Sequence, residues 1–184
     1  MFNSKKLERI KAQARLIFKA SFLENLSAAE RYEFLQLCHS RSYKADEYIY
    51  YQGDPGTGMY LIEAGEVELK VDGEGDIPPE IFLLSAPEAF GMLSLSHEMR
   101  RLSTARCVTE TKLLGFFRPD LERLQDRHPK IAIKLHEMLN ILLARQLQAT
   151  IQNLEKVTGK TFAYSLILEE FYRKSGHQNE ENLS

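Results

Sequence analysis

The chain has 184 residues, of which 43% are hydrophobic and 27% charged, so it can bury a core without needing a disulfide or a metal. Its net charge of −2 at pH 7 argues against a dedicated nucleic-acid binder, because such proteins are usually strongly basic. The chain lacks the roughly 18 to 20 consecutive apolar residues of a membrane helix, and its N-terminus does not have the pattern of a signal peptide.

Two cysteines are too few for a disulfide framework or a zinc cluster, and they fit a reducing compartment. We therefore expect a cytoplasmic protein, with Cys38 and Cys107 serving as small core residues.

Two helices are expected in residues 1–41. Apolar residues recur at three- and four-residue steps over residues 5–20, at Leu7, Ile10, Ala14, Ile17 and Phe18. Basic residues fill other positions of this amphipathic helix. We interpret them as a solvated face rather than as a membrane or nucleic-acid surface. The sequence from Ser27 to Glu30 is a capping box that predicts the start of the second helix.

Short apolar runs separated by glycine, proline and aspartate occupy residues 42–118. Strands are expected at residues 48–51, 59–62, 66–71, 81–84, 104–108 and 112–117. Their close spacing and glycine-rich turns indicate an antiparallel barrel or jelly roll rather than a parallel sheet with crossover helices.

Residues 119–184 are predicted to be helical. A short helix over 120–126 is followed by a long helix over about 130–157, with Pro129 in its first turn and Gly159 after its end. One stripe of this helix is apolar, at Leu135, Leu139, Leu143, Leu147, Ile151 and Leu154. The stripe predicts a homodimer through the long helix, and packing within one copy is the alternative. One further helix is expected over 161–174, before a polar tail.

The predicted fold is therefore α+β: an antiparallel β jelly-roll barrel over 42–118, with N-terminal helices over 1–41 and C-terminal helices over 119–184.

Within the barrel, residues 47–69 follow the pattern Glu-x-Ile-x-x-Gln-Gly-Asp-x-Gly-x-x-Met-Tyr-x-Ile-x-x-Gly-x-Val-Glu-Leu. This pattern resembles the first half of a cyclic-nucleotide-binding domain. Residues 89–95 and 101–105 resemble the phosphate-binding cassette of that family. The resemblance covers roughly residues 21–154 and is to sensor domains of the catabolite-activator type.

The resemblance implies a ligand site in the cassette. In this family a short helix offers backbone amides to the ligand phosphate, and an arginine pairs with the phosphate oxygens. Arg101 stands at the arginine position, although taken alone it would be interpreted as a solvated surface residue. The candidate ligand-binding residues are Gly91, Met92, Leu93, Ser94, Arg101, Leu102 and Ser103. The ligand implied is a cyclic nucleotide, cAMP or cGMP, and no cofactor is expected.

Met92 departs from the family, which places a glutamate there to accept the ribose 2′-hydroxyl. A buried hydroxyl left unpaired costs about 1–3 kcal/mol. Pro87 and Arg100 are further departures. Three interpretations stay open: weak binding of a cyclic nucleotide, binding of another small anion by Arg100 and Arg101 together, or a vestigial pocket in a protein-interaction module.

Other functions have less support in the sequence. We find no catalytic triad spacing, paired metal-ligating histidines or phosphate loop, and His97 has no second ligand beside it, so neither an enzyme nor a metal site is expected. The segment after Gly159 is too short for a helix-turn-helix domain, which makes DNA binding unlikely and a truncated transcription regulator only an alternative. The sequence thus predicts a regulatory sensor that signals to a partner.

Overall fold

The computed structural model describes residues 13, 16–73, 75 and 77–165. It divides into two compact units, Met1–Leu139 and Asn140–Ser184, which we describe separately. The expected helix over 5–20 lies mostly outside the described residues, although residues 13 and 16–19 are helical. The expected helix over 161–174 is described only as far as residue 165, and residues 160–165 are helical.

The first unit opens with a short 3-10 helix, η1 (Ser21–Leu23), and the helix α2 (Ala28–Gln36). The capping box is confirmed: the Ser27 hydroxyl accepts a hydrogen bond from the amide of Glu30, whose carboxylate accepts one from the amide of Ser27. These two bonds satisfy amides that a helix start would otherwise leave unpaired.

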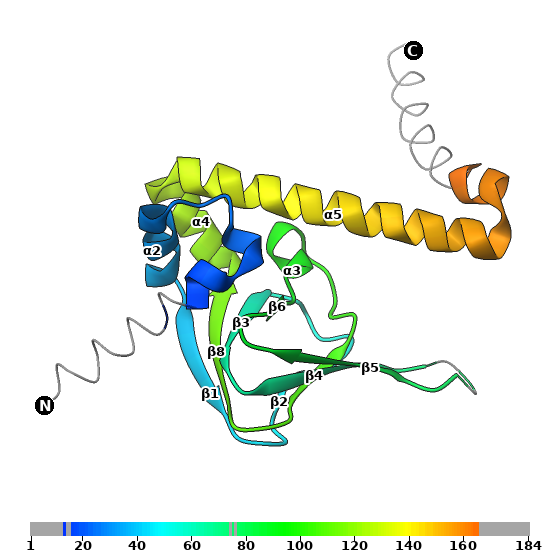
Figure 1. Cartoon of the computed structure of the whole chain (residues 1–184), viewed down its shortest axis with the longest axis horizontal. Helices are drawn as coiled ribbons and strands as arrows, with labels where there is room; N and C mark the ends of the chain where they lie inside the picture. Colours follow the sequence, from blue (N-terminus) through cyan, green and yellow to red (C-terminus); the bar gives the residue numbers. More distant parts are fainter. Residues whose placement is uncertain (1–12, 14–15, 74, 76, 166–184) are drawn as a thin grey trace, which may run out of the picture. The chain divides into compact units, whose positions relative to one another are not determined.

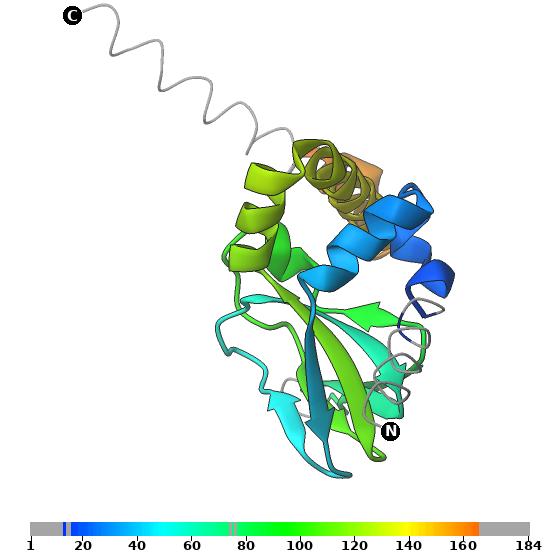
Figure 2. The same cartoon turned by 90° about the vertical axis from the view of Figure 1, so that its left-hand side faces the viewer.

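Two antiparallel four-stranded sheets follow (Figures 1 and 2). The first has the order β1 (His39–Tyr43), β8 (Thr111–Phe117), β3 (Gly58–Ala64) and β6 (Ala89–Phe90). The second has the order β2 (Tyr48–Tyr50), β7 (Thr104–Cys107), β4 (Glu66–Val71) and β5 (Glu80–Ser85). The predicted α+β fold with antiparallel strands and a long C-terminal helix is confirmed.

The sequence does not predict strand β1. Four of its five residues are exposed, so its sequence carries no alternation of apolar and polar residues. It is a strand because it pairs with β8, from His39 opposite Gly115 to Tyr43 opposite Thr111. Long-range pairing, rather than local pattern, creates this strand.

The core consists of two clusters that share strand β3. Met59 and Leu61 pack with the helices, whereas Tyr60 and Ile62 pack in the cluster formed by the two sheets. Successive strand side chains point to opposite faces, so one strand contributes to both clusters. Cys107 is fully buried, as expected, and both cysteines are free.

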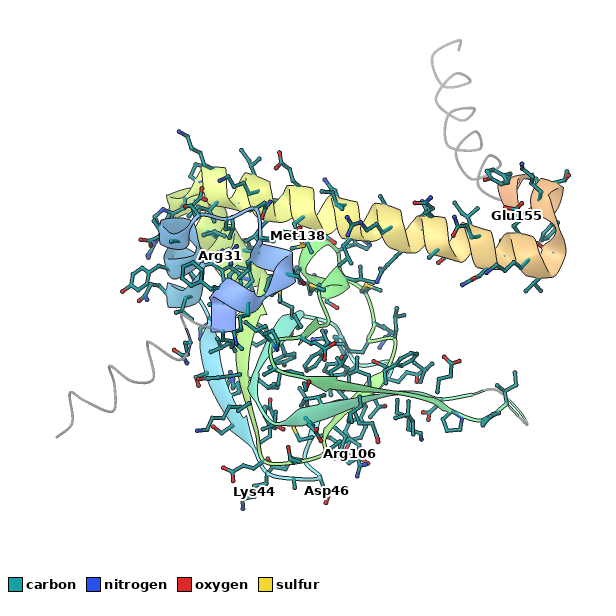
Figure 3. All side chains as sticks on the ribbon, viewed as in Figure 1. Arg31, Lys44, Asp46, Arg106, Met138 and Glu155 are labelled. Carbon is teal, nitrogen blue, oxygen red and sulfur yellow. The ribbon has the colours of Figure 1, made fainter. Side chains whose placement is uncertain are left out.

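Ion pairs join strands at the surface of the second sheet. Arg106 on β7 lies 2.8 Å from Asp46 and 3.4 Å from Glu68 on β4. Figure 3 labels Arg106 and Asp46 near the same end of the sheets. Because the Asp46 side chain is 78% exposed, its pair with Arg106 contributes little to stability.

Helix α4 (Arg118–Arg127) starts two residues before the expected position, because Asp120 lies in its first turn, where it accepts a hydrogen bond from the Phe117 amide. Helix α5 (Pro129–Thr158) buries Ile131, Leu135 and Leu139 in the first unit. It ends before Gly159, which has a positive φ of 86°. No helix among the described residues is long and apolar enough to cross a membrane.

Candidate functional site

The candidate cassette is built from β6, the short helix α3 (Leu93–Ser96) and the loop before β7. Gly91 has a φ of +76°, which turns the chain from β6 into the helix. The helical turn is closed by hydrogen bonds from the Ser94 amide to Gly91 and from the Leu95 amide to Met92. Met92 is thus the N-cap residue of α3, directly before the first backbone amides that have no partner within the helix.

Arg101 points into the protein and is only 6% exposed. Its Nη1 atom donates hydrogen bonds to the Gly58 carbonyl at 2.8 Å and to the Ser94 hydroxyl at 3.4 Å. Its backbone is tied to the turn that precedes β3, because its amide donates to Asp54 and its carbonyl accepts from Gly53. The interpretation of Arg101 as a solvated surface residue is therefore wrong.

The Arg101 guanidinium has no counter-ion within the described part of the chain. Its Nε atom is buried and has no hydrogen-bond partner. Among the residues that the structure describes, no carboxylate lies within ion-pair distance of it. Burying a charge without a partner is strongly unfavourable. A bound anion would supply both the missing charge and the missing acceptor.

Two glycines allow the turn and the cassette to approach this closely. A Cβ atom at Gly91 would lie 2.5 Å from Nη1 of Arg101, and one at Gly56 would overlap the Ser94 hydroxyl. The Gly56 amide also donates to the Met99 carbonyl at 2.8 Å. Glycine is required at both positions, because any larger residue would push Arg101 or Ser94 out of place.

Tyr50 and Tyr60 surround the arginine, and sequence reasoning missed both. The Tyr50 ring centre lies 4.2 Å from Cζ of Arg101 and that of Tyr60 lies 5.9 Å away. Burial raises the pKa of both hydroxyls, and the charge of Arg101 opposes that rise. The Ser103 side chain also lowers the pKa of Tyr50.

The signal that could have identified Tyr50 is weak. Tyr48 and Tyr51 are about half exposed and stack on each other, with ring centres 4.8 Å apart. Strict alternation would place Tyr48 and Tyr50 on one face, but the register shifts between them. The sequence has tyrosines at positions 48, 50 and 51, and only the irregular pairing of β2 with β7 selects Tyr50 as the one that reaches Arg101.

The remaining candidate residues do not all converge on the guanidinium. Ser94 is buried against it, and Met92 is partly buried and packs on the helical core cluster. Leu93 is half-buried, whereas the Leu102 side chain is 64% exposed. Arg100 is exposed and donates to the Gly53 carbonyl at 2.7 Å.

A separate cavity of about 510 Å³ lies at the start of α4, lined by His39, Thr57, Phe117, Arg118, Pro119, Asp120, Glu122 and Arg123. Its buried carboxylate, Asp120, is already satisfied by His39 at 3.0 Å and by the Phe117 amide. The described part of the chain contains no cluster of three or more side chains suited to a metal ion. The unpaired charge of Arg101 therefore directs attention to the cassette.

Comparison with known proteins places this geometry in a family. Residues 40–128 match the family described as the cyclic nucleotide-binding domain. A stretch of 108 residues is 38% identical to the cyclic AMP receptor protein of Thermus thermophilus, covering 59% of this chain and 48% of the relative. A stretch of 109 residues is 32% identical to the cAMP-dependent protein kinase regulatory subunit of Schizosaccharomyces pombe, covering 59% of this chain and 26% of that protein.

The fold comparison agrees. The crystal structure of the Thermus thermophilus catabolite activator protein matches with a TM-score of 0.66 and 32% identity, covering 74% of this chain and 62% of that one. This chain spans less than half the length of the two curated relatives. Residues 40–128 of this chain therefore match the cyclic nucleotide-binding domain family.

Proposed function

We propose that this chain is a non-catalytic regulatory sensor that binds a cyclic nucleotide, cAMP or cGMP, in the cassette. The observation that carries the proposal is the buried guanidinium of Arg101, which has no counter-ion among the described residues. The proposed site comprises Gly91, Met92, Leu93, Ser94, Arg101, Leu102 and Ser103. The names of the relatives, a cyclic AMP receptor protein and a cAMP-dependent kinase regulatory subunit, support the choice of ligand.

The free edge of Arg101 suits a phosphate. Nη1 is held by Gly58 and Ser94, whereas neither Nε nor Nη2 has a hydrogen-bond partner among the described residues. An arginine can donate two parallel hydrogen bonds from one edge to two oxygens of the same phosphate. Lysine offers only a point charge, so the geometry favours a ligand with paired oxygens.

Met92 lowers the affinity that we expect. It stands where the family's glutamate accepts the ribose hydroxyl, and its thioether is only a weak acceptor. Leaving that hydroxyl unpaired costs about 1–3 kcal/mol, which corresponds to roughly 5- to 150-fold in the dissociation constant. Binding in the micromolar to millimolar range is therefore the expected result.

Calorimetric titration of the full chain with cAMP and with cGMP tests the proposal. We expect binding by the wild type, loss of binding in Arg101→Gln, and unchanged binding in Arg100→Gln. The last variant removes the neighbouring charge, which is exposed and bonded to a backbone carbonyl. No heat from the wild type at millimolar ligand, or equal binding by Arg101→Gln, would refute the proposal and favour a protein-interaction module.

The signal would pass through a homodimer. In the second unit Leu143 and Leu147 are 39% and 55% exposed, and they lie four residues apart on one face of α5. The same face of a second copy would cover both leucines in a two-helix seam. Ligand binding would then shift the population of cassette conformations and alter what this dimer presents to a partner in the cytoplasm.

A further inference from the structure

The Tyr50 ring covers one face of the Arg101 guanidinium. Cζ of Arg101 lies over the Tyr50 ring, 4.2 Å from its centre, which is within the range of a cation–π contact. All the N–H donors of a guanidinium lie in its plane, so a ring on the face leaves them free. Tyr50 therefore restrains the guanidinium plane without competing for the hydrogen bonds that Arg101 can donate.

Tyr50 is itself held in place by other aromatic rings. Its ring centre lies 6.1 Å from that of Phe90 and 6.3 Å from that of Tyr60, and these two rings stack on each other at 5.4 Å. Its backbone pairs with Ala105 on β7, four residues after Arg101. The ring is thus fixed by β2, β3 and β6 together, which are the strands around the cassette.

We propose that Tyr50 is a positioning and specificity residue of this site: it orients the free Nε edge of Arg101 toward an oxyanion and denies its covered face to a flat aromatic ligand. This inference rests on the proposed function and extends it, because it states how the ligand must approach. A phosphate would have to approach in the guanidinium plane, and a base would be kept off the face that Tyr50 occupies.

Four proteins test the proposal. Tyr50→Leu removes the aromatic ring, and Tyr50→Phe keeps the ring and removes only the hydroxyl. Tyr51→Leu is the matched control, because Tyr51 is the next residue, is 54% exposed and stacks on Tyr48 rather than on Arg101. The fourth protein is the wild type. All four are titrated with cAMP, and the wild type and Tyr50→Leu also with adenosine, which lacks the phosphate.

A second measurement does not depend on a ligand. The Nε–Hε resonance of Arg101 in a ¹H–¹⁵N NMR spectrum, assigned by its loss in Arg101→Gln, is shifted by a ring stacked on the guanidinium. We expect this shift in the wild type, Tyr50→Phe and Tyr51→Leu, and its loss in Tyr50→Leu. Unchanged resonance in Tyr50→Leu would show that the ring does not hold Arg101 and would overturn the inference.

The affinities for cAMP distinguish a Tyr50 ring that positions Arg101 from one that obstructs the ligand. We expect Tyr50→Leu to bind cAMP about 3- to 30-fold more weakly than the wild type, with Tyr50→Phe and Tyr51→Leu within about 2-fold of it. Adenosine should bind detectably to Tyr50→Leu and not to the wild type. Tighter cAMP binding by Tyr50→Leu, or equal binding of adenosine and cAMP by the wild type, would overturn the inference. If no protein binds cAMP, the proposed function fails, and with it the role of Tyr50 in specificity, while the resonance still reports the stacking.

Discussion

The carboxylate of Glu30 accepts two hydrogen bonds of 2.8 Å from the ammonium of Lys134, joining α2 to the first half of α5. The Lys134 carbonyl also accepts a hydrogen bond from Asn25. The Lys134 hydrogen bonds and the Ser27 amide together lower the pKa of Glu30 from 4.5 to about 2. One ion pair therefore links the helices that precede and follow the sheets.

This linkage predicts a pH-dependent stability. Because folding lowers the pKa of Glu30, its contribution is complete above pH 4.5 and is lost as the pH falls from 4.5 toward 2. The Glu30 side chain is 21% exposed, so we expect Glu30→Gln to reduce the free energy of unfolding at pH 7 by only about 1 kcal/mol. Urea unfolding should show the difference from wild type shrinking toward pH 3.

Glu33→Gln provides the control on the same helix. Glu33 is 43% exposed and lies 3.4 Å from His128, so its removal should matter less than that of Glu30 at pH 7. Equal losses in the two variants, or a Glu30→Gln difference that persists at low pH, would contradict the assignment.

Gly91→Ala should damage both stability and binding. Its φ of +76° disfavours any side chain, and the new Cβ would lie 2.5 Å from Nη1 of Arg101. Gly53→Ala is the matched variant, because Gly53 has a φ of +86° but open space around the added atom. We expect each to lose about 1–3 kcal/mol of stability, with the greater loss in Gly91→Ala.

Only Gly91→Ala should also abolish cAMP binding, because only there does the added methyl group displace the arginine. Thermal unfolding and calorimetric titration of both variants measure the two effects. Binding that survives in Gly91→Ala would mean that the position of Arg101 is unimportant.

Met92→Glu should tighten cAMP binding. The new carboxylate would accept the ribose 2′-hydroxyl, for a gain of roughly 5- to 150-fold in affinity. Met92→Gln, with an uncharged acceptor, should gain less. Because Met92 packs partly on the helical core cluster, a modest fall in stability is expected in both variants. Titration beside an unfolding curve distinguishes the two effects, and no gain in either variant would mean that the ribose does not lie at this position.

The exposed leucines of α5 predict an oligomeric state. We expect sedimentation equilibrium to show a wild-type dimer and a monomer for the double variant Leu143→Glu with Leu147→Glu. Ala149→Glu adds one glutamate about 200° away around the helix from Leu147 and should leave the dimer intact. A monomeric wild type, or a dimer in all variants, would rule out this interface.

Several elements were predictable from the sequence because their causes are local. The Ser27 capping box, the stop at Gly159 and the glycine turns before β3 each depend on the conformational needs of a few neighbouring residues. Helix α5 was also expected within one residue of its observed bounds, because its apolar period is long and regular. The family resemblance followed from the same glycines.

The tertiary structure decided the rest. Strand β1 exists only because it pairs with β8, about 70 residues later, and Tyr50 reaches Arg101 only because the register of β2 shifts against β7. The surroundings of Arg101 depend on distant segments, such as those that contain Asp54 and Ser94, which meet only in the folded chain. These segments decide whether the guanidinium faces water or the interior and whether a carboxylate lies beside it. Local sequence determines turns and caps because their energetics involve near neighbours, whereas the burial and pairing of a charge depend on every segment that folding brings around it.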